Sequence, residues 1–101
     1  MLDPDKRYAR HPDIAWRVID GDGLLVDPRN GKIFPLNSVA IRIWQLLDSQ
    51  HCIAAIVGVL TAEYDASPQV MREDAHAFIG QLIEAKLLIE APEPQRTDAK
   101  E

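Results

Sequence analysis

The chain contains little cysteine, few aromatic residues and no long apolar run. Among its 101 residues there is one cysteine, Cys52, and 6% are aromatic. A single cysteine permits no internal disulfide and fits a reducing compartment. No apolar stretch approaches the roughly 20 residues of a membrane span, and the polar residues 1–12 do not have the pattern of a signal peptide. We therefore expect a cytoplasmic protein with no membrane association.

Positive charge is also scarce. Eleven Lys and Arg stand against sixteen Asp and Glu, so the formal net charge is -5. Binding to nucleic acid requires a basic face, and the composition therefore argues against nucleic acid as the main partner. With 47% apolar residues, a chain of this length is expected to fold as one domain without disulfides or a structural metal.

Short strands are predicted in the first half of the chain. Apolar residues recur between Ile14 and Ile19, and a turn at residues 20–23 leads into Leu24-Leu25-Val26. A second turn at residues 27–31 contains Pro28 and Asn30-Gly31 and leads into Lys32–Leu36. These three strands predict an antiparallel sheet. Pro35 has no N–H to donate, so the third strand is expected at an edge.

The apolar spacing becomes helical after Leu36. Asn37 or Ser38 is suited to begin a helix that ends near residues 48–49, and a second helical pattern runs from Ile53 to Tyr64. Ser67 followed by Pro68 predicts the start of a third helix. The expected fold class is α+β and winged helix-turn-helix-like, with a three-stranded antiparallel sheet followed by three helices. The predicted boundaries are a flexible N-terminal segment at 1–13, a folded domain at 14–89 and a disordered C-terminal tail at 90–101.

Few residues are suited to catalysis or metal binding. His11, His51 and His76 lie on three different segments and have no ligand spacing, and Cys52 is expected to act as a small buried side chain. The Gly21-Asp22-Gly23 stretch lacks the further glycines and the Lys of a phosphate-binding loop. The sequence therefore predicts no catalytic residue, no metal site and no cofactor, and we expect a protein that is not an enzyme.

Several motifs occur in an order that resembles a known family. They are residues 16–21 and 24–27, the stretch 31–37 ending in Leu36-Asn37, the segment 43–48 (Ile-Trp-Gln-Leu-Leu-Asp), residues 54–57, Tyr64-Asp65 and Ala77-Phe78-Ile79. Together they resemble the PqqD-like (coenzyme PQQ synthesis protein D-like) domains, which are recognition elements for ribosomally made and modified peptides. The resemblance covers about residues 14 to 89.

Three positions depart from the family pattern. Ser49 and Lys86 stand where the family usually has glycine. Glycine would give a left-handed helix cap at low cost, so these residues predict altered helix termination rather than lost function. Residues 24–29 also lack the glutamate of the PQQ pathway's own member. The resemblance therefore leaves the biosynthetic pathway open.

The resemblance implies a non-catalytic adaptor that binds the leader of a precursor peptide by β-strand addition. The leader would lie between the edge at 32–36 and the third helix, and the adaptor would present it to a maturase, often a radical-SAM enzyme. Apolar leader residues are expected to contact Ile79 and Ile83, and leader carboxylates to meet Arg72, His76 and Lys32. The predicted peptide-binding residues are Lys32, Ile33, Phe34, Pro35, Leu36, Arg72, His76, Ile79 and Ile83.

Two other functions stay open at this point. One is a winged-helix DNA-binding regulator, although acidic residues outnumber basic ones in the third helix. The other is a structural partner subunit that stabilises an enzyme without contacting its substrate. An exposed edge strand also allows two copies of the chain to pair as a homodimer.

Overall fold

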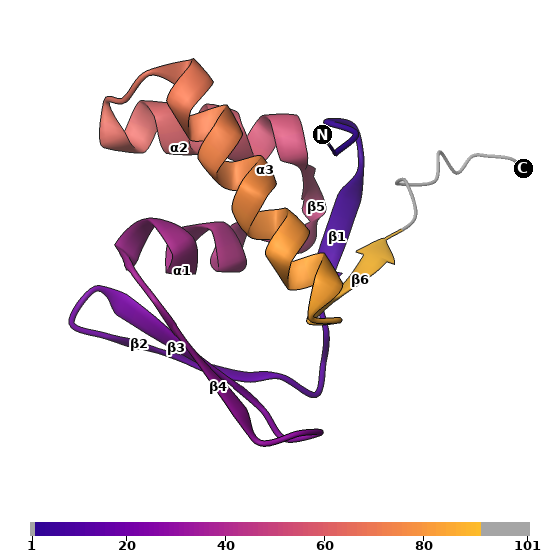
Figure 1. The fold of residues 1–101 in the computed structure, drawn as a ribbon. Helices are drawn as coiled ribbons and strands as arrows, with labels where there is room; N and C mark the ends of the chain where they lie inside the picture. The colour runs from indigo at the N-terminus through magenta and orange to yellow at the C-terminus, as the bar shows by residue number, and fades with distance from the viewer. Residues whose placement is uncertain (1, 92–101) are drawn as a thin grey trace, which may run out of the picture.

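The fold was analysed in a computed structural model, which describes residues 2–91. Two small sheets and three helices make up this part of the chain (Figure 1). In chain order the elements are β1 (Arg7–Arg10), β2 (Ala15–Ile19), β3 (Asp22–Asp27), β4 (Lys32–Leu36), α1 (Ser38–Leu46), β5 (Asp48–Cys52), α2 (Ile53–Tyr64), α3 (Pro68–Glu84) and β6 (Leu88–Ala91).

The first sheet confirms the predicted fold class. Strands β2, β3 and β4 follow one another as an antiparallel sheet in the order β2-β3-β4, so β4 is an edge strand as Pro35 predicted. The buried Leu25 of β3 is paired with Trp16 of β2 and Phe34 of β4. The helices lie on one side of this sheet (Figure 1). The three-stranded sheet and the three helices that follow it therefore form the expected α+β arrangement.

A second sheet was not predicted. It has the order β5-β1-β6 and is antiparallel throughout, with β1 in its centre. Strand β1 lies inside the segment expected to be flexible, and β6 includes residues 90–91 of the expected tail. The other residues of that tail, 92–101, lie outside the described residues. The sequences of β1 and β5, RYAR and DSQHC, lack the apolar alternation by which strands are recognised. They were therefore missed.

Backbone hydrogen bonds attach the N-terminal segment to distant parts of the chain. The Arg10 N–H donates to the Leu47 carbonyl (3.2 Å), the His11 N–H donates to the Leu87 carbonyl (2.9 Å), and the Ile53 N–H donates to the Lys6 carbonyl (3.1 Å). The segment therefore connects the end of α1, the start of α2 and the end of α3.

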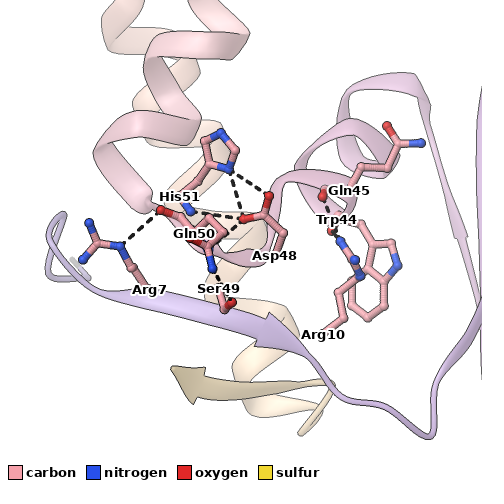
Figure 2. A network of polar contacts seen from close by, with 8 residues as sticks. All are labelled: Arg7, Arg10, Trp44, Gln45, Asp48, Ser49, Gln50 and His51. Atoms are coloured by element: carbon pink, nitrogen blue, oxygen red, sulfur yellow. Dashed lines mark hydrogen bonds and ion pairs between the residues drawn. The ribbon is translucent and has the colours of Figure 1, made fainter. Parts of the chain in front are cut away.

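Arg10 makes a side-chain connection between the two sheets. Its guanidinium donates to the carbonyls of Trp44 (3.1 Å) and Gln45 (2.8 Å) in the last turn of α1 (Figure 2). A cation stabilises a helix at this end because the free carbonyls there carry partial negative charge. The same guanidinium lies 5.3 Å from the centre of the Trp16 ring, within the range of a cation–π contact. Arg10 therefore joins β1, α1 and β2.

Helix α1 packs tightly on β3. Its N-cap is Asn37, whose Oδ1 accepts a hydrogen bond from the Ala40 N–H (2.8 Å). A Cβ atom added to Gly23 would lie 2.4 Å from Cδ1 of Ile41, so only glycine fits at this position without a shift of the helix. Around this contact lies the core, whose largest fully buried apolar residues are Trp44, Leu25, Ile43, Leu47, Ile53, Ile56, Leu60, Ile79 and Leu87.

The two positions without the family's glycine keep a left-handed backbone. Ser49 has φ 69° and Lys86 has φ 61°. At the end of α3 the Lys86 N–H donates to the Ile83 carbonyl (3.0 Å), and the Leu87 N–H donates to the Leu82 carbonyl (3.0 Å). This pair of bonds is the Schellman motif in which glycine is the usual left-handed residue. The expectation of altered termination of α3 was therefore wrong, because Lys86 adopts the conformation that glycine would supply.

The contact at Gly23 gives a stability prediction. Gly23→Ala should lower the free energy of unfolding by about 1–3 kcal/mol, because its new methyl group overlaps Ile41. Gly58→Ala is the matched control: nothing lies within 4 Å of its Cβ position in α2, and it should raise stability by about 0.5–1 kcal/mol. Urea unfolding of both variants measures the difference. A Gly23→Ala variant as stable as Gly58→Ala would contradict the close packing.

The left-handed backbone at Lys86 gives a second prediction. Lys86→Gly should raise the free energy of unfolding by about 1 kcal/mol, because glycine removes the steric cost of positive φ. Lys86→Ala removes the same charge but keeps a Cβ, so its stability should stay closer to that of the unchanged chain. Thermal and urea unfolding compare the three proteins. Equal stability of the Gly and Ala variants would refute the strain at this residue.

Candidate functional site

An apolar groove lies between the edge strand β4 and helix α3. It has a volume of about 360 Å³. The residues that line it come from β4, from α3 and its C-terminal end, and from Leu87: Ile33, Phe34, Pro35, Leu36, Phe78, Gln81, Leu82, Ala85 and Leu87. Among them only Gln81 has a polar side chain.

The strand that borders the groove has free backbone groups on its outer edge. Within residues 2–91, β4 pairs with β3 alone. Because Pro35 has no N–H, it fits an edge strand where its nitrogen faces away from the neighbouring strand. Backbone groups of alternate residues face the same side, so the N–H and C=O of Ile33 face outward as well. Ile33 can therefore exchange a pair of hydrogen bonds with an added strand.

The floor of the groove is well packed. Leu36, Leu82 and Leu87 are 9%, 3% and 0% exposed. The Schellman motif at Lys86 turns the chain so that Leu87 follows Leu82 on the same side of the helix end. The groove therefore has a floor that belongs to the protein core, with the more exposed residues of β4 at its margin.

An ion pair holds one end of the groove together. The carboxylate of Asp27, at the end of β3, accepts hydrogen bonds from Nε and Nη2 of Arg29 (both 2.9 Å). Nη2 also donates to the Lys86 carbonyl (2.8 Å). Asp27 is 1% exposed, and the Arg29 guanidinium lowers the pKa of its carboxyl against the opposing effect of burial. Arg29 thus joins the β3–β4 hairpin to the end of α3.

The groove continues toward the start of α3. A second hollow of about 350 Å³ shares Phe78 and Gln81 with the first and reaches Asn37, Val39 and Asp74. The two hollows therefore form one track along α3. Basic residues, Lys32 and Lys86, lie at its hairpin end, where Arg29 joins the hairpin to α3, and Asp74 lies toward its other end. The track is therefore apolar in the middle and has opposite charges toward its ends.

The five predicted residues of the edge lie at this groove. Ile33, Phe34, Pro35 and Leu36 line it, and Lys32 begins the strand. Their position beside α3 agrees with the sequence-based expectation. Their contact with a peptide stays a prediction.

The four residues predicted on the third helix do not line the groove. Ile79 is 0% exposed and belongs to the core. Arg72 and His76 line a separate hollow of about 190 Å³ together with Pro4 and Ala54, and Ile83 is half-buried outside the groove lining. Residues 72, 76, 79 and 83 form a stripe offset from Phe78, Leu82 and Ala85, which line the groove together with Gln81. Helical spacing alone did not distinguish these two faces of α3.

His76 is also unsuited to the charged role predicted for it. The residue is 8% exposed and its Nδ1 has no hydrogen-bond partner. Burial and the nearby Arg72 guanidinium lower the pKa of His76 below its usual 6.5, so the ring is neutral at pH 7. A neutral ring cannot pair with a leader carboxylate as a cation.

A larger hollow adjoins the track at Ala77 and Gln81 of α3. It has a volume of about 570 Å³, and its lining includes Leu2, Glu73, Gly80 and Glu84. No strand contributes to its lining, so it offers no sheet edge to an extended peptide. Its two glutamates would also repel an acidic ligand. The groove beside β4 is therefore the stronger candidate for peptide binding.

The described part of the chain contains no cluster of three or more His, Cys, Asp or Glu residues that is suited to holding a metal ion. The pair formed by His51 Nδ1 and Asp48 Oδ1 (3.0 Å) belongs to the turn in β5, where the same carboxylate accepts the N–H groups of Gln50 and His51 (Figure 2). None of the helices in residues 2–91 combines the length and apolar character needed to span a bilayer.

The Arg29 ion pair gives a prediction about Asp27. Arg29→Ala should raise the pKa of the Asp27 carboxyl, because the strongest interaction that lowers it is lost while burial remains. Carboxyl ¹³C NMR titration measures this change. Arg42→Ala is the control, since it removes the ion pair with Glu63 and should leave Asp27 unaffected.

The same ion pair should make stability depend on pH. A carboxyl whose pKa is lowered by folding stabilises the fold fully above its unfolded pKa of about 3.8. This contribution is lost as the pH falls through the lowered value. The stability difference between the unchanged chain and Arg29→Ala should therefore be largest near neutral pH and shrink in acid. A constant difference between pH 7 and pH 2 would contradict this role of Asp27.

Comparison with solved structures shows similar chains that bind leader peptides. One is the chain in the structure "TbiB1 in Complex with the TbiA(beta) Leader Peptide", which is 28% identical to this chain in sequence and has a TM-score of 0.71. The match covers 79% of this chain and 93% of that chain. "Lasso peptide synthetase B1 complexed with the leader peptide" is also 28% identical, with a TM-score of 0.72 and coverage of 82% and 98%. Comparison with curated proteins gives no match.

A third structure shows the same fold at lower identity. It is the PqqD truncation of Methylobacterium extorquens PqqCD, described as a stand-alone recognition element for ribosomally synthesised and post-translationally modified peptides. It is 19% identical, has a TM-score of 0.73, and the match covers 88% of this chain and 95% of that chain. The family model "Coenzyme PQQ synthesis protein D (PqqD)" matches residues 22–88, which include β3, β4 and all three helices. The chain therefore belongs to the PqqD family.

Proposed function

We propose that this chain is a non-catalytic adaptor that binds the leader of a ribosomally made precursor peptide and presents the peptide to a modifying enzyme. The observation that carries this proposal is the free edge of β4 beside an apolar groove. Two similar chains are named in complex with leader peptides, which supports the same class of ligand here.

The leader would add to β4 as a fourth strand. Main-chain hydrogen bonds, beginning with the pair at Ile33, would hold its backbone with little dependence on its sequence. Alternate leader side chains would enter the groove, whose lining is apolar apart from Gln81. The groove would therefore select apolar residues at these positions, with one polar group near Gln81.

Charge would set the direction of the leader. The hairpin end of the track has Lys32 and Lys86, whereas Asp74 lies toward its other end. A leader with acidic residues toward the hairpin and a basic residue toward Asp74 would complement both charges. Arg72 and His76 line neither the groove nor its continuation, so this binding mode does not include them.

Presentation of the leader would help the enzyme through effective concentration. A tethered precursor stays near the active site, so its modified portion needs little affinity of its own. The enzyme would be a radical-SAM protein or another peptide maturase, and the site of action would be the cytoplasm. A homodimer paired through β4 would occupy the edge that the leader needs, so such a dimer would compete with peptide binding.

Removal of one backbone donor should test the binding mode. Ile33→Pro should weaken leader binding by roughly tenfold, because it removes an outward N–H and places a proline ring on the edge. Ile33→Val keeps the N–H and a similar side chain, so it should bind nearly as well as the unchanged chain. Amide NMR titration with the leader encoded beside this gene measures both affinities, and the unbound spectra report whether each variant is folded.

The same titration distinguishes the other functions. We expect shifts at residues 32–36 and at Phe78, Gln81 and Ala85, and none from duplex DNA. Equal affinity of folded Ile33→Pro and Ile33→Val would exclude strand addition at this edge. A response to DNA alone would favour a winged-helix regulator, and a spectrum unchanged by the leader would favour a structural partner subunit.

A further inference from the structure

The groove runs along the edge of β4. It is lined by four consecutive residues of the strand, Ile33–Leu36. Because successive residues of a strand point to opposite faces, a hollow that touches all four borders the edge of β4 and not one of its faces. The opposite wall is formed by Phe78, Gln81, Leu82 and Ala85 of α3 and its end. A leader strand in this groove therefore has one backbone edge against β4 and the other toward α3.

The edge of the leader that faces α3 needs hydrogen-bond partners. The N–H and C=O of one strand residue point to one side, and those of the next residue point to the other. Every second leader residue therefore directs its backbone groups toward α3. A backbone group that is shielded from water without a partner weakens a complex. Phe78, Leu82 and Ala85 have no side-chain donor or acceptor to offer.

Gln81 has a side chain that can meet this need. It is exposed and is the one lining residue that all three hollows along α3 share. Within residues 2–91 the side chains of Gln45, Gln50 and Gln69 each have a hydrogen-bond partner, whereas that of Gln81 has none. Its donor and acceptor are therefore both available to a ligand in the groove.

The carboxamide group suits a peptide backbone. It carries a donor and an acceptor side by side, so it can accept from the N–H and donate to the C=O of one residue. A neighbouring antiparallel strand supplies the same pair of bonds. Gln81 can thus replace one residue of a strand on the side of the leader where the protein has a helix.

We infer that Gln81 binds the leader backbone: its Oε1 accepts from the N–H, and its Nε2 donates to the C=O, of one leader residue that faces α3. The inference rests on the proposed function. This contact fixes the register of the leader against α3. It also requires an N–H at that leader position, so proline is excluded there. Gln81 therefore determines specificity through the backbone, and the side chain at this leader position is free to vary.

Removal of the carboxamide tests the contact. Gln81→Met keeps a side chain of similar length but removes both the donor and the acceptor, so it should bind the leader about tenfold more weakly. Gln69→Met is the matched control, since Gln69 is exposed on the same helix and lines none of the three hollows. It should bind nearly as tightly as the unchanged chain. Calorimetry with a synthetic leader peptide, of the sequence encoded beside this gene, measures the affinities, and thermal unfolding reports whether each variant is folded.

Changes in the peptide distinguish a backbone contact from a side-chain contact. In a series of synthetic leaders, one amide at a time is replaced by an ester, which removes a single N–H. At one position the ester should weaken binding to the unchanged chain about fivefold and leave binding to Gln81→Met nearly unaffected. Esters at positions that face β4 should weaken binding to both proteins alike. Alanine at the position that faces Gln81 should change the affinity little.

Each failure has a distinct meaning. If Gln81→Met and Gln69→Met bind the leader equally well, the contact is refuted while leader binding stands. If the effect of Gln81→Met disappears with an alanine substitution in the leader and with no ester, Gln81 binds a leader side chain and the backbone contact is overturned. If the unchanged chain does not bind the leader, the proposed function itself is overturned, together with this inference.

Discussion

The close approach of α1 to β3 at Gly23 determines where the groove can form. Without a Cβ at this position, Ile41 rests directly on the backbone of the central strand. Helix α1 therefore covers the middle of the sheet, and α3 runs beside β4 at its margin. The backbone groups on the outer edge of β4 stay free, while its residue Leu36 joins the core. A bulkier residue at position 23 would displace α1 and change the space between β4 and α3.

The parts of the fold that were predicted depend on local signals. Turn residues at 20–23 and 27–31 separate strands with apolar residues, and Asn37 and Pro68 mark helix starts that the structure confirms. Strands β1 and β5 have polar sequences and pair with segments far away in the chain. Their pairing depends on backbone hydrogen bonds and on the Arg7 side chain, whose Nε donates to the Gln50 carbonyl of β5. Such contacts leave no periodic pattern in the sequence.

The groove shows why helical periodicity alone did not identify the site. Helix α3 is buried over a wide arc, so that Ile79 and Leu82 are both nearly inaccessible although only Leu82 lines the groove. Apolar spacing marks both residues and does not show which one borders β4. The distinction depends on the angle at which α3 crosses the sheet. That angle is held at one end by Arg29, which bonds Asp27 and the Lys86 carbonyl.

Pro35 has a kinetic consequence for a strand bound at β4. The edge is five residues long, and one of its outward positions has a carbonyl but no donor. An added strand therefore lacks one hydrogen bond in its ladder, a loss of about 1 kcal/mol that shortens the lifetime of the complex about fivefold. An adaptor must release each peptide before it can accept the next. The missing donor thus favours repeated use of one adaptor molecule over long retention of a single peptide.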